Sequence, residues 1–261
     1  MGTHRAGNAR SIQGGRFLSE NYKLWAHPKT HAKVKEFLSG LPRGKFLDIG
    51  AGEGALSATA KELGFVVSAC DLQPDIFKAP GIECKQCNLD EALPFPDENF
   101  DCAACVETIE HLRDRYAFLA ECSRVLKPGG MLVLTTPNVL NLAARGKYLA
   151  SGFFPLFNRP VNEFEPHPTH THINPVSYYY LRHALVANGF EITEVTTDKY
   201  RKSALLLAWL YPLAVLASMH SVRKESHPRQ RETNREILKR MRSAALLFGR
   251  TLIVVAKRIK D

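Results

Sequence analysis

Residues 46–57 read FLDIGAGEGALS, and this stretch decides how the chain folds. Two apolar residues and an acid come before three glycines at alternate positions, Gly50, Gly52 and Gly54. Glycine has no Cβ, so it adopts positive φ readily and lets a ligand come close to bare peptide groups. An apolar strand, a glycine loop and a helix in this order are typical of a site for a nucleotide-like ligand. The stretch therefore predicts a ligand loop at the end of a strand.

The rest of the chain alternates between strand and helix patterns. We expect helices over residues 54–64, from about 113 to 126, and over 174–189. We expect strands over residues 45–50, 65–72, 81–89, 100–107, 129–138, 190–200 and 250–258. Such alternation predicts an α/β fold with a mostly parallel sheet and helices on both faces.

Charge is unevenly distributed along the chain. Its 261 residues are 45% apolar, enough for a substantial core, and the net charge is +9. Residues 1–200 have a net charge of −1, whereas residues 201–261 have a net charge of +10. The basic excess is therefore a local contact surface, and the pattern argues against a generally basic nucleic-acid-binding protein.

Four of the six cysteines have a spacing close to that of a zinc ribbon. Cys84, Cys87, Cys102 and Cys105 form C-x2-C-x14-C-x2-C. Both pairs fall in expected strands, where residues i and i+3 point to opposite faces, so we expect free thiols and no zinc. Free thiols and the absence of an apolar run in the first 30 residues lead us to expect a cytoplasmic protein.

Three acids distinguish between the two common ligands of such a loop. The glycine spacing also satisfies the dinucleotide pattern G-x-G-x-x-G/A, so spacing alone decides nothing. Asp48 lies inside the strand end, where a dinucleotide site usually has an apolar residue, and Glu53 lies in the loop, where it would repel a pyrophosphate. Asp71 ends the next strand and could accept both ribose hydroxyls. A cationic sulfonium without phosphate, as in S-adenosylmethionine, suits these acids better than NAD.

The chain resembles the class I S-adenosylmethionine-dependent methyltransferases. Within them it is similar to the subgroup that includes the ubiquinone-biosynthesis O-methyltransferases and related small-molecule and lipid methyltransferases. The resemblance covers residues 44–198 and is carried by FLDIGAGEG, VVSACDL, CNLDEALPFPDENFDCAACVETIEHL, RVLKPGGMLVLTTPN and HINPVSYYYLRHALVANGFEITEV. It implies a seven-stranded Rossmann-like sheet, mostly parallel, with the last strand antiparallel.

The resemblance also implies cofactor-binding roles at the ends of four strands. The loop around the methionine part of the cofactor would consist of Asp48, Gly50, Ala51, Gly52 and Gly54. The ribose would be held by Asp71 and Leu72, and adenine would lie against Asn88 and Leu89. Asn88 stands where the family more often has aspartate. The pocket beside the sulfur would be closed by Val106 and Glu107.

Catalysis is less evident from the sequence. Methyl transfer is an in-line displacement, so the enzyme mainly aligns the acceptor with the methyl group. A hydroxyl acceptor also needs a base, and His111 is our candidate; the alternative is that His111 only caps or packs a helix. A second polar group could supply a base, hold a metal or belong to a lid over the acceptor, and we assign no metal to it. This group comprises Glu163, Glu165, His167, His170 and His172.

The chain departs from the family pattern between its last two strands, which normally form a short hairpin. Residues 201–248 are inserted there, which predicts three parts. They are an N-terminal helical region (1–43), a cofactor-binding domain (44–200 plus 249–261) and a helical insert (201–248). Because the sixth strand runs parallel to the first five, the insert should emerge at their carboxyl ends. We expect it, together with residues 138–174, to cover the acceptor site.

The insert combines apolar and basic segments. Residues 203–219 contain no charge, fall short of a membrane span and include Pro212. Basic residues flank this run, and an apolar helical face follows it, formed by Ile237, Met241, Ala244 and Leu247. This pattern predicts an interfacial element within residues 203–245 that contacts anionic lipid. The alternative is a buried hairpin or a dimer contact.

These observations predict a methyltransferase that transfers a methyl group from S-adenosylmethionine to oxygen of a small-molecule or lipid-linked acceptor. We expect peripheral membrane contact and no nucleic-acid partner. Two alternatives stay open. One is an RNA methyltransferase that uses the basic C-terminal region, although residues 221–245 lack interleaved aromatics. The other is a non-catalytic protein that binds the cofactor.

Overall fold

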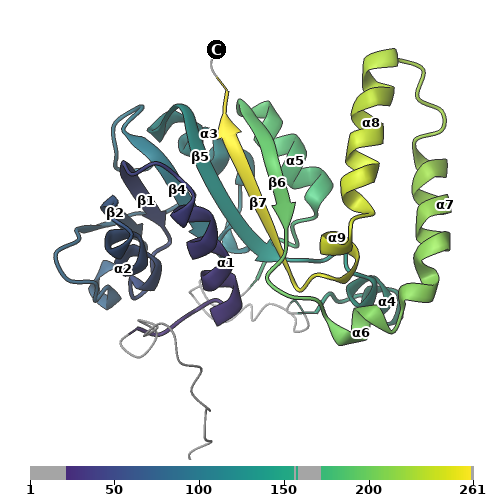
Figure 1. Ribbon diagram of the computed structural model, residues 1–261, viewed down its shortest axis with the longest axis horizontal. Helices are drawn as coiled ribbons and strands as arrows, with labels where there is room; N and C mark the ends of the chain where they lie inside the picture. The colour runs from purple at the N-terminus through teal and green to yellow at the C-terminus, as the bar shows by residue number, and fades with distance from the viewer. Residues whose placement is uncertain (1–21, 156, 158–171, 260–261) are drawn as a thin grey trace, which may run out of the picture.

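The computed structural model describes residues 22–155, 157 and 172–259, and its centre is a seven-stranded sheet (Figure 1). The strands are β1 (Lys45–Ile49), β2 (Val66–Asp71), β3 (Cys84–Gln86), β4 (Phe100–Val106), β5 (Leu126–Pro137), β6 (Phe190–Thr196) and β7 (Thr251–Arg258). Their order across the sheet is β3-β2-β1-β4-β5-β7-β6. β1 to β5 are parallel, and β7 pairs antiparallel with both β5 and β6. The expected fold class, including the antiparallel last strand, is confirmed.

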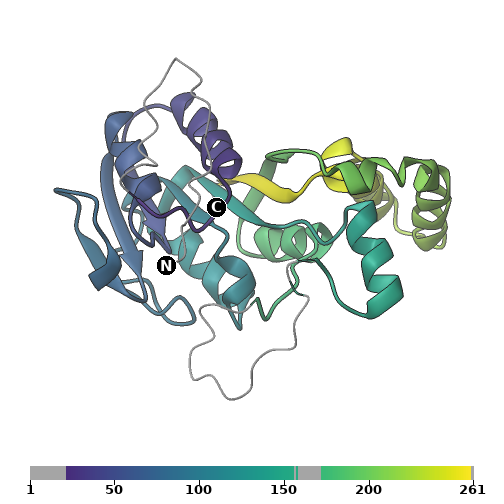
Figure 2. The same cartoon turned by 90° about the horizontal axis from the view of Figure 1, so that it is seen from below.

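Helices cover both faces of the sheet, as Figure 2 shows from below. One face carries α1 (Pro28–Ser39) and α2 (Ala55–Glu62), and the other carries α3 (Arg115–Val125) and α5 (Tyr178–Ala187). Short 3-10 turns, η2 (Pro74–Ile76) and η3 (Ile109–His111), follow β2 and β4.

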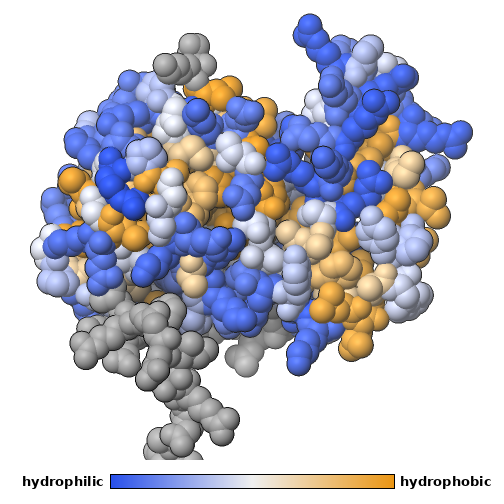
Figure 3. Space-filling model, viewed as in Figure 1, coloured by the Kyte–Doolittle hydropathy of each residue, from blue (hydrophilic) through white to orange (hydrophobic). Residues whose placement is uncertain are grey.

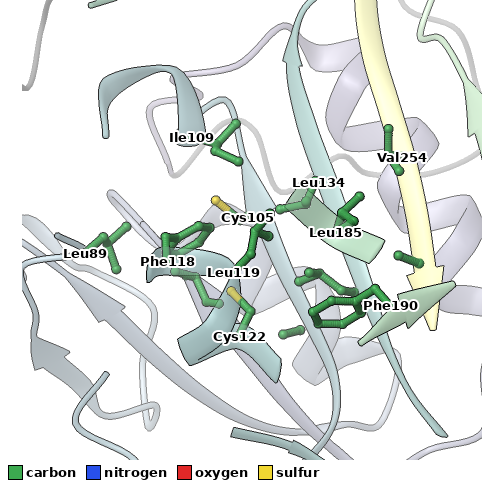
Figure 4. Close-up of a cluster of buried hydrophobic side chains, with 14 of the residues drawn as sticks. Leu89, Cys105, Ile109, Phe118, Leu119, Cys122, Leu134, Leu185, Phe190 and Val254 are labelled. Carbon is green, nitrogen blue, oxygen red and sulfur yellow. The ribbon is translucent and has the colours of Figure 1, made fainter. Parts of the chain in front are cut away.

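The core consists of two apolar layers separated by the sheet. The larger layer lies under α3 and α5, where Phe118, Cys122 and Phe190 are buried against the strands (Figure 4). The smaller layer lies under α1 and α2 and includes Val34 and Leu56. The central strands β1 and β4 are buried almost throughout, because helices cover both faces of the sheet.

Two cysteines of the ribbon-like pattern lie in different layers. Cys102 packs in the layer under α1 and α2, whereas Cys105 packs in the layer under α3 and α5. Burial raises the pKa of the Cys102 thiol to about 12, so it stays protonated. Because the two side chains point to opposite faces of β4, they cannot bind one zinc ion together.

The segment between β6 and β7 is helical. It contains α6 (Lys202–Leu205), η5 (Ala208–Leu210), α7 (Tyr211–Ser221), α8 (Pro228–Met241) and α9 (Ala244–Phe248). α6 and α9 contact each other and α4 (Leu142–Ser151) beyond the carboxyl ends of β5 and β6. α8 instead stands beside the sheet on the side of its edge strand β6, and α7 lies on the outer side of α8 (Figure 1). The insert therefore covers the carboxyl edge only with its first and last helices.

Packing of α8 explains this arrangement and corrects one prediction. Ile237 and Leu247 are buried and Met241 packs against the core, so three of the four residues that we assigned to a membrane face the protein; Ala244 is exposed. α8 contacts α5, and Arg240 donates a hydrogen bond to the Ile192 carbonyl of β6 (3.2 Å). Ser243 caps α9 as a separate helix, so the two segments form no continuous interfacial helix.

Within the described residues, no helix combines the length and the apolar character that crossing a bilayer requires.

Candidate functional site

The glycine loop has the strained geometry that its sequence predicts. Gly50, Gly52 and Gly54 have φ values of +72°, +54° and +89°, a region that other residues enter only at a cost. The Gly52 N–H donates to Oδ2 of Asp71 (2.8 Å), and the Gly50 N–H donates to the Cys70 carbonyl (2.9 Å). The loop is therefore fastened to the end of β2, and Gly54 begins α2.

Side chains also close over the outside of this loop. A Cβ on Gly52 would meet the Trp25 ring at 2.8 Å, and a Cβ on Gly54 would meet the Phe77 ring at 2.7 Å. Glu53 forms an ion pair with Lys78 (2.9 Å) and accepts a hydrogen bond from the backbone N–H of residue 23, which lowers its pKa. Glu53 thus ties the segment before α1 to the loop, a role that sequence reasoning did not assign.

Asp48 is the buried acid of the first strand. Only 2% of its surface is exposed, and its Oδ2 accepts a hydrogen bond from the Ser57 hydroxyl of α2 (2.6 Å). Burial raises the pKa of Asp48 to about 7, because the charged form is poorly solvated there. A cation above the loop would favour its ionisation.

The ribose and adenine candidates lie at the ends of β2 and β3. The Asp71 carboxylate accepts from the N–H groups of Gly52 and Gln73 and is partly exposed, so it can accept further bonds. Leu72 is exposed and Asn88 lies at the surface, where its side chain bonds to Glu91.

Leu89, the second adenine candidate, differs from these residues. Its side chain is buried in the core under α3, as Figure 4 shows, so only its backbone can line an adenine pocket.

The end of β4 holds the two pocket-closing candidates. Val106 is partly buried, and Glu107 has a φ of +51°, which is rare for a residue with a side chain. The Glu107 N–H donates to the Thr135 hydroxyl (3.0 Å) on the neighbouring strand β5. Burial raises the pKa of the Glu107 carboxyl to about 7, against the lowering effect of Arg250.

His111 lies in a group of three metal-ligating side chains. Its ring centroid is 4.7 Å from that of His172, and Nε2 of His172 is 3.9 Å from Oε1 of Glu110. One ligand atom from each residue lies within 4.8 Å of the others, so the group could hold a metal ion. Of the five residues that we proposed downstream of the fifth strand, only His172 belongs to the described residues; Glu163, Glu165, His167 and His170 lie outside them.

Glu110 is the residue that sequence reasoning missed. It is fully buried, and among the described residues neither of its carboxyl oxygens has a hydrogen-bond partner. Burial raises its pKa well above the usual value, and the charge of Glu107 adds to the effect. Its carbonyl accepts from the N–H groups of Ile173 and Asn174, which brings His172 to the turn. An acid directly before His111 was visible in ETIEHL, but its burial was not.

Asp198 and Arg250 form a second polar group near Glu107. Arg250 Nη1 is 3.1 Å from Oδ2 of Asp198, whose side chain is fully buried, and Thr30 of α1 donates to the same oxygen (3.3 Å). These two residues flank the insert, so the sequence gave no sign that they meet. They connect β6, β7 and α1 beside the end of β4.

Comparison with known proteins agrees with this geometry. A family model described as a methyltransferase domain matches residues 47–134. The chain is 34% identical over 133 residues to the ubiquinone biosynthesis O-methyltransferase of Psychrobacter arcticus, covering 47% of this chain and 51% of that protein. It is 29% identical over 202 residues to the human mitochondrial ubiquinone biosynthesis O-methyltransferase, and the match covers 72% of this chain and 53% of that protein. The chain thus spans about half the length of these relatives.

Solved structures show the same fold. A SAM-dependent methyltransferase from Archaeoglobus fulgidus superposes with a TM-score of 0.54 at 21% identity, over 87% of this chain and 92% of that one. The methyltransferase domain and these neighbours of the same fold support S-adenosylmethionine as the cofactor. The chain thus carries a methyltransferase domain in a fold shared with S-adenosylmethionine-dependent methyltransferases, and it is similar to the ubiquinone biosynthesis O-methyltransferases.

Proposed function

We propose that the protein transfers the methyl group of S-adenosylmethionine to a hydroxyl of a small-molecule acceptor. The observation that carries this proposal is the convergence of two groups at one edge of the sheet. The loop held by Asp71 lies after β1 and β2, and the group around His111 lies after the neighbouring β4. Parallel α/β sheets bind ligands at this edge.

The reaction needs alignment and one proton acceptor. The acceptor oxygen attacks the methyl carbon, the carbon–sulfur bond breaks, and its electron pair stays on sulfur, which leaves S-adenosylhomocysteine. The hydroxyl proton goes to His111, whose ring lies beside that of His172. Glu110 belongs to the same group, and its ionised form would stabilise the positive charge that His111 gains.

Eleven residues keep their proposed cofactor roles, with one refinement. The loop, Asp71 and the end of β4 supply side chains or peptide groups, whereas Leu89 supplies only backbone. The division into an N-terminal region (1–43), a cofactor-binding domain (44–200 plus 249–261) and an insert (201–248) likewise stays a proposal.

Calorimetry with an Asp71→Ala variant tests the cofactor assignment. We expect micromolar binding of S-adenosylmethionine and S-adenosylhomocysteine, weakened at least roughly tenfold in the variant, because a charged acceptor of two hydrogen bonds is lost. The control is Asp75→Ala, which removes an exposed acid of η2. Heat from NAD and none from S-adenosylmethionine would refute the proposal.

A divalent cation is a second candidate for activation of the acceptor. It is favoured by the carboxyl of Glu110, which is buried beside two imidazoles and accepts no hydrogen bond within the described residues. Such an ion would ionise Glu110 and polarise the hydroxyl directly. Two measurements distinguish a metal from a His111 base. They are metal analysis of protein purified without chelator and turnover measured before and after EDTA. A His111 base predicts turnover that survives EDTA, and a metal predicts its loss and recovery on adding the ion back.

The acceptor itself is the finer part of the proposal. The names of the relatives point to a quinone pathway, so we propose a hydroxyl on a lipid-linked molecule and peripheral contact with a membrane. A screen with methyl-labelled cofactor against lipid, quinone and RNA fractions tests this. Label in RNA would favour the RNA alternative, and no label in any fraction would favour a non-catalytic protein.

A further inference from the structure

An exposed apolar surface borders the carboxyl edge of the sheet. We define the apolar face by Leu149 and Phe153 at the end of α4, Leu206 and Trp209 around η5, and Leu213 and Leu216 on α7. Leu149, Leu206 and Trp209 are 90%, 79% and 73% exposed. Figure 3, which shares the view of Figure 1, shows hydrophobic side chains gathered over α6 and the lower part of α7.

The two segments that carry the apolar face pack against each other. α4 contacts α6, and Gly146 of α4 lies against Leu207, whose Cδ1 would be 3.7 Å from an added Cβ. Pro212 lies in the first turn of α7, so the uncharged run bends at η5 and does not continue as one rod. The apolar face is thus one surface built from segments about 60 residues apart in sequence.

α7 is covered very little by the rest of the described chain. It has 11 residues, most of them apolar, and none is buried. A short helix of this kind owes its stability in water to burial of apolar side chains, and here Leu213, Leu216 and Met219 are each more than half exposed. Something outside the described chain therefore covers it.

Charge identifies the partner. Residues 138–155 and 199–224, which carry the apolar face, contain no Asp or Glu. They contain seven basic residues. Arg145 is partly buried against the Leu140 carbonyl and Lys199 contacts His27, which leaves five at the surface, namely Lys147, Arg201, Lys202, Arg223 and Lys224. In a symmetric dimer through this surface, these cations would face their own copies across the interface and repel them. An anionic surface is complementary instead.

We propose that the apolar face docks onto a bilayer that contains anionic lipid, with its leucines and Trp209 in the headgroup region. The face follows the carboxyl ends of β5 and β6, the edge that carries the His111 group. The proposal rests on the function proposed above. With the face on a bilayer, a lipid-borne hydroxyl can reach the site without crossing water. The basic α8 lies beyond the face and packs on the protein, so it is not the docking element.

Vesicle co-sedimentation with full-length protein tests the proposal. We expect binding to vesicles of phosphatidylcholine and phosphatidylglycerol, and weaker binding to phosphatidylcholine alone. Leu149→Glu and Leu206→Glu should each weaken binding by roughly tenfold or more, since each removes a leucine from the bilayer. The matched control is Val186→Glu, which alters an exposed residue near the end of α5, at the opposite edge of the sheet, and should bind as wild type.

Fluorescence supplies a second readout. The chain has two tryptophans, so a Trp25→Phe background reports on Trp209 alone, whose emission should shift to the blue when vesicles are added. Calorimetry with S-adenosylmethionine on the same variants, measured without vesicles, keeps a failed cofactor assignment distinct from a failed docking surface. Three results would overturn the proposal: no binding to either vesicle, equal loss in the Val186→Glu control, or a dimer in light scattering that Leu149→Glu dissociates.

Discussion

His111 is the side chain on which the proposed chemistry depends. Because it accepts the hydroxyl proton, His111→Ala should lower kcat by roughly 10²- to 10⁴-fold and leave cofactor affinity nearly unchanged. Steady-state kinetics and calorimetry on the same preparation check both halves. His183→Ala, which removes a histidine that bonds Tyr116 on the far side of α3, is the control. A His111 variant that loses cofactor binding and kcat together would show a structural role.

Asp48 should make stability depend on pH. Its folded pKa of about 7 lies above the usual value of 3.8, so between these values the folded protein holds a proton that the unfolded chain has released. The free energy of unfolding should therefore fall as pH rises through this window, by roughly 4 kcal/mol for a shift of about three units.

Denaturant titrations without cofactor, from about pH 4 to about pH 7.5, measure this slope. Asp48→Asn keeps an acceptor for the Ser57 hydroxyl and should make the slope shallower, because only the contributions of acids such as Glu107 and Glu110 then remain, whereas the exposed-site variant Asp75→Asn should keep the wild-type slope. Equal slopes in wild type and Asp48→Asn would show that Asp48 is ionised in the folded protein.

At the scale of single elements, backbone strain and contacts with neighbouring side chains together fix the shape of the glycine loop. Gly54 and Gly152 both have positive φ, and both stand at a helix end. A Cβ on Gly54 would meet Phe77 and Ala79 within 2.8 Å, whereas a Cβ on Gly152 would meet nothing within 4 Å.

Comparison of the two alanine variants separates strain from steric conflict. Gly152→Ala should cost about 1 kcal/mol of stability, from backbone strain alone, and leave cofactor affinity unchanged. Gly54→Ala should lower stability by more than this and should also weaken the binding of S-adenosylmethionine, because the loop must shift. Urea unfolding and calorimetry measure the pair, and equal effects would mean that the neighbours of Gly54 yield freely.

At the scale of the whole molecule, cofactor binding should stabilise the folded chain. A ligand at 100 times its Kd adds about 2.7 kcal/mol, which for a chain of this size raises Tm by roughly 5–10 °C. S-adenosylmethionine and S-adenosylhomocysteine should both give this shift in calorimetric scans, and NAD should give none. The Asp71→Ala variant should need a higher cofactor concentration for the same shift.

The sequence by itself determined the features that depend on neighbouring residues. The three glycines and the strand before them predicted the loop and its positive φ values, whereas its bond to Asp71 of β2 came from the structure. Alternating patterns predicted the seven strands, and the long interval between the last two predicted an inserted segment. These signals are local, because backbone strain, strand periodicity and turn chemistry act over a few residues.

Only the tertiary structure decided what each apolar or charged side meets. Ile237 and Leu216 both lie on apolar stretches of the insert, yet Ile237 packs inside while Leu216 is 66% exposed. Helical spacing shows that a side is apolar and cannot show what covers it. Glu110, Asp198 and Arg250 likewise became site residues through contacts across 50 or more positions of sequence, Glu110 with the candidate His172 and Asp198 with Arg250. Burial and charge pairing belong to the packed chain, and they decide which acids are neutral and which surface is left for a partner.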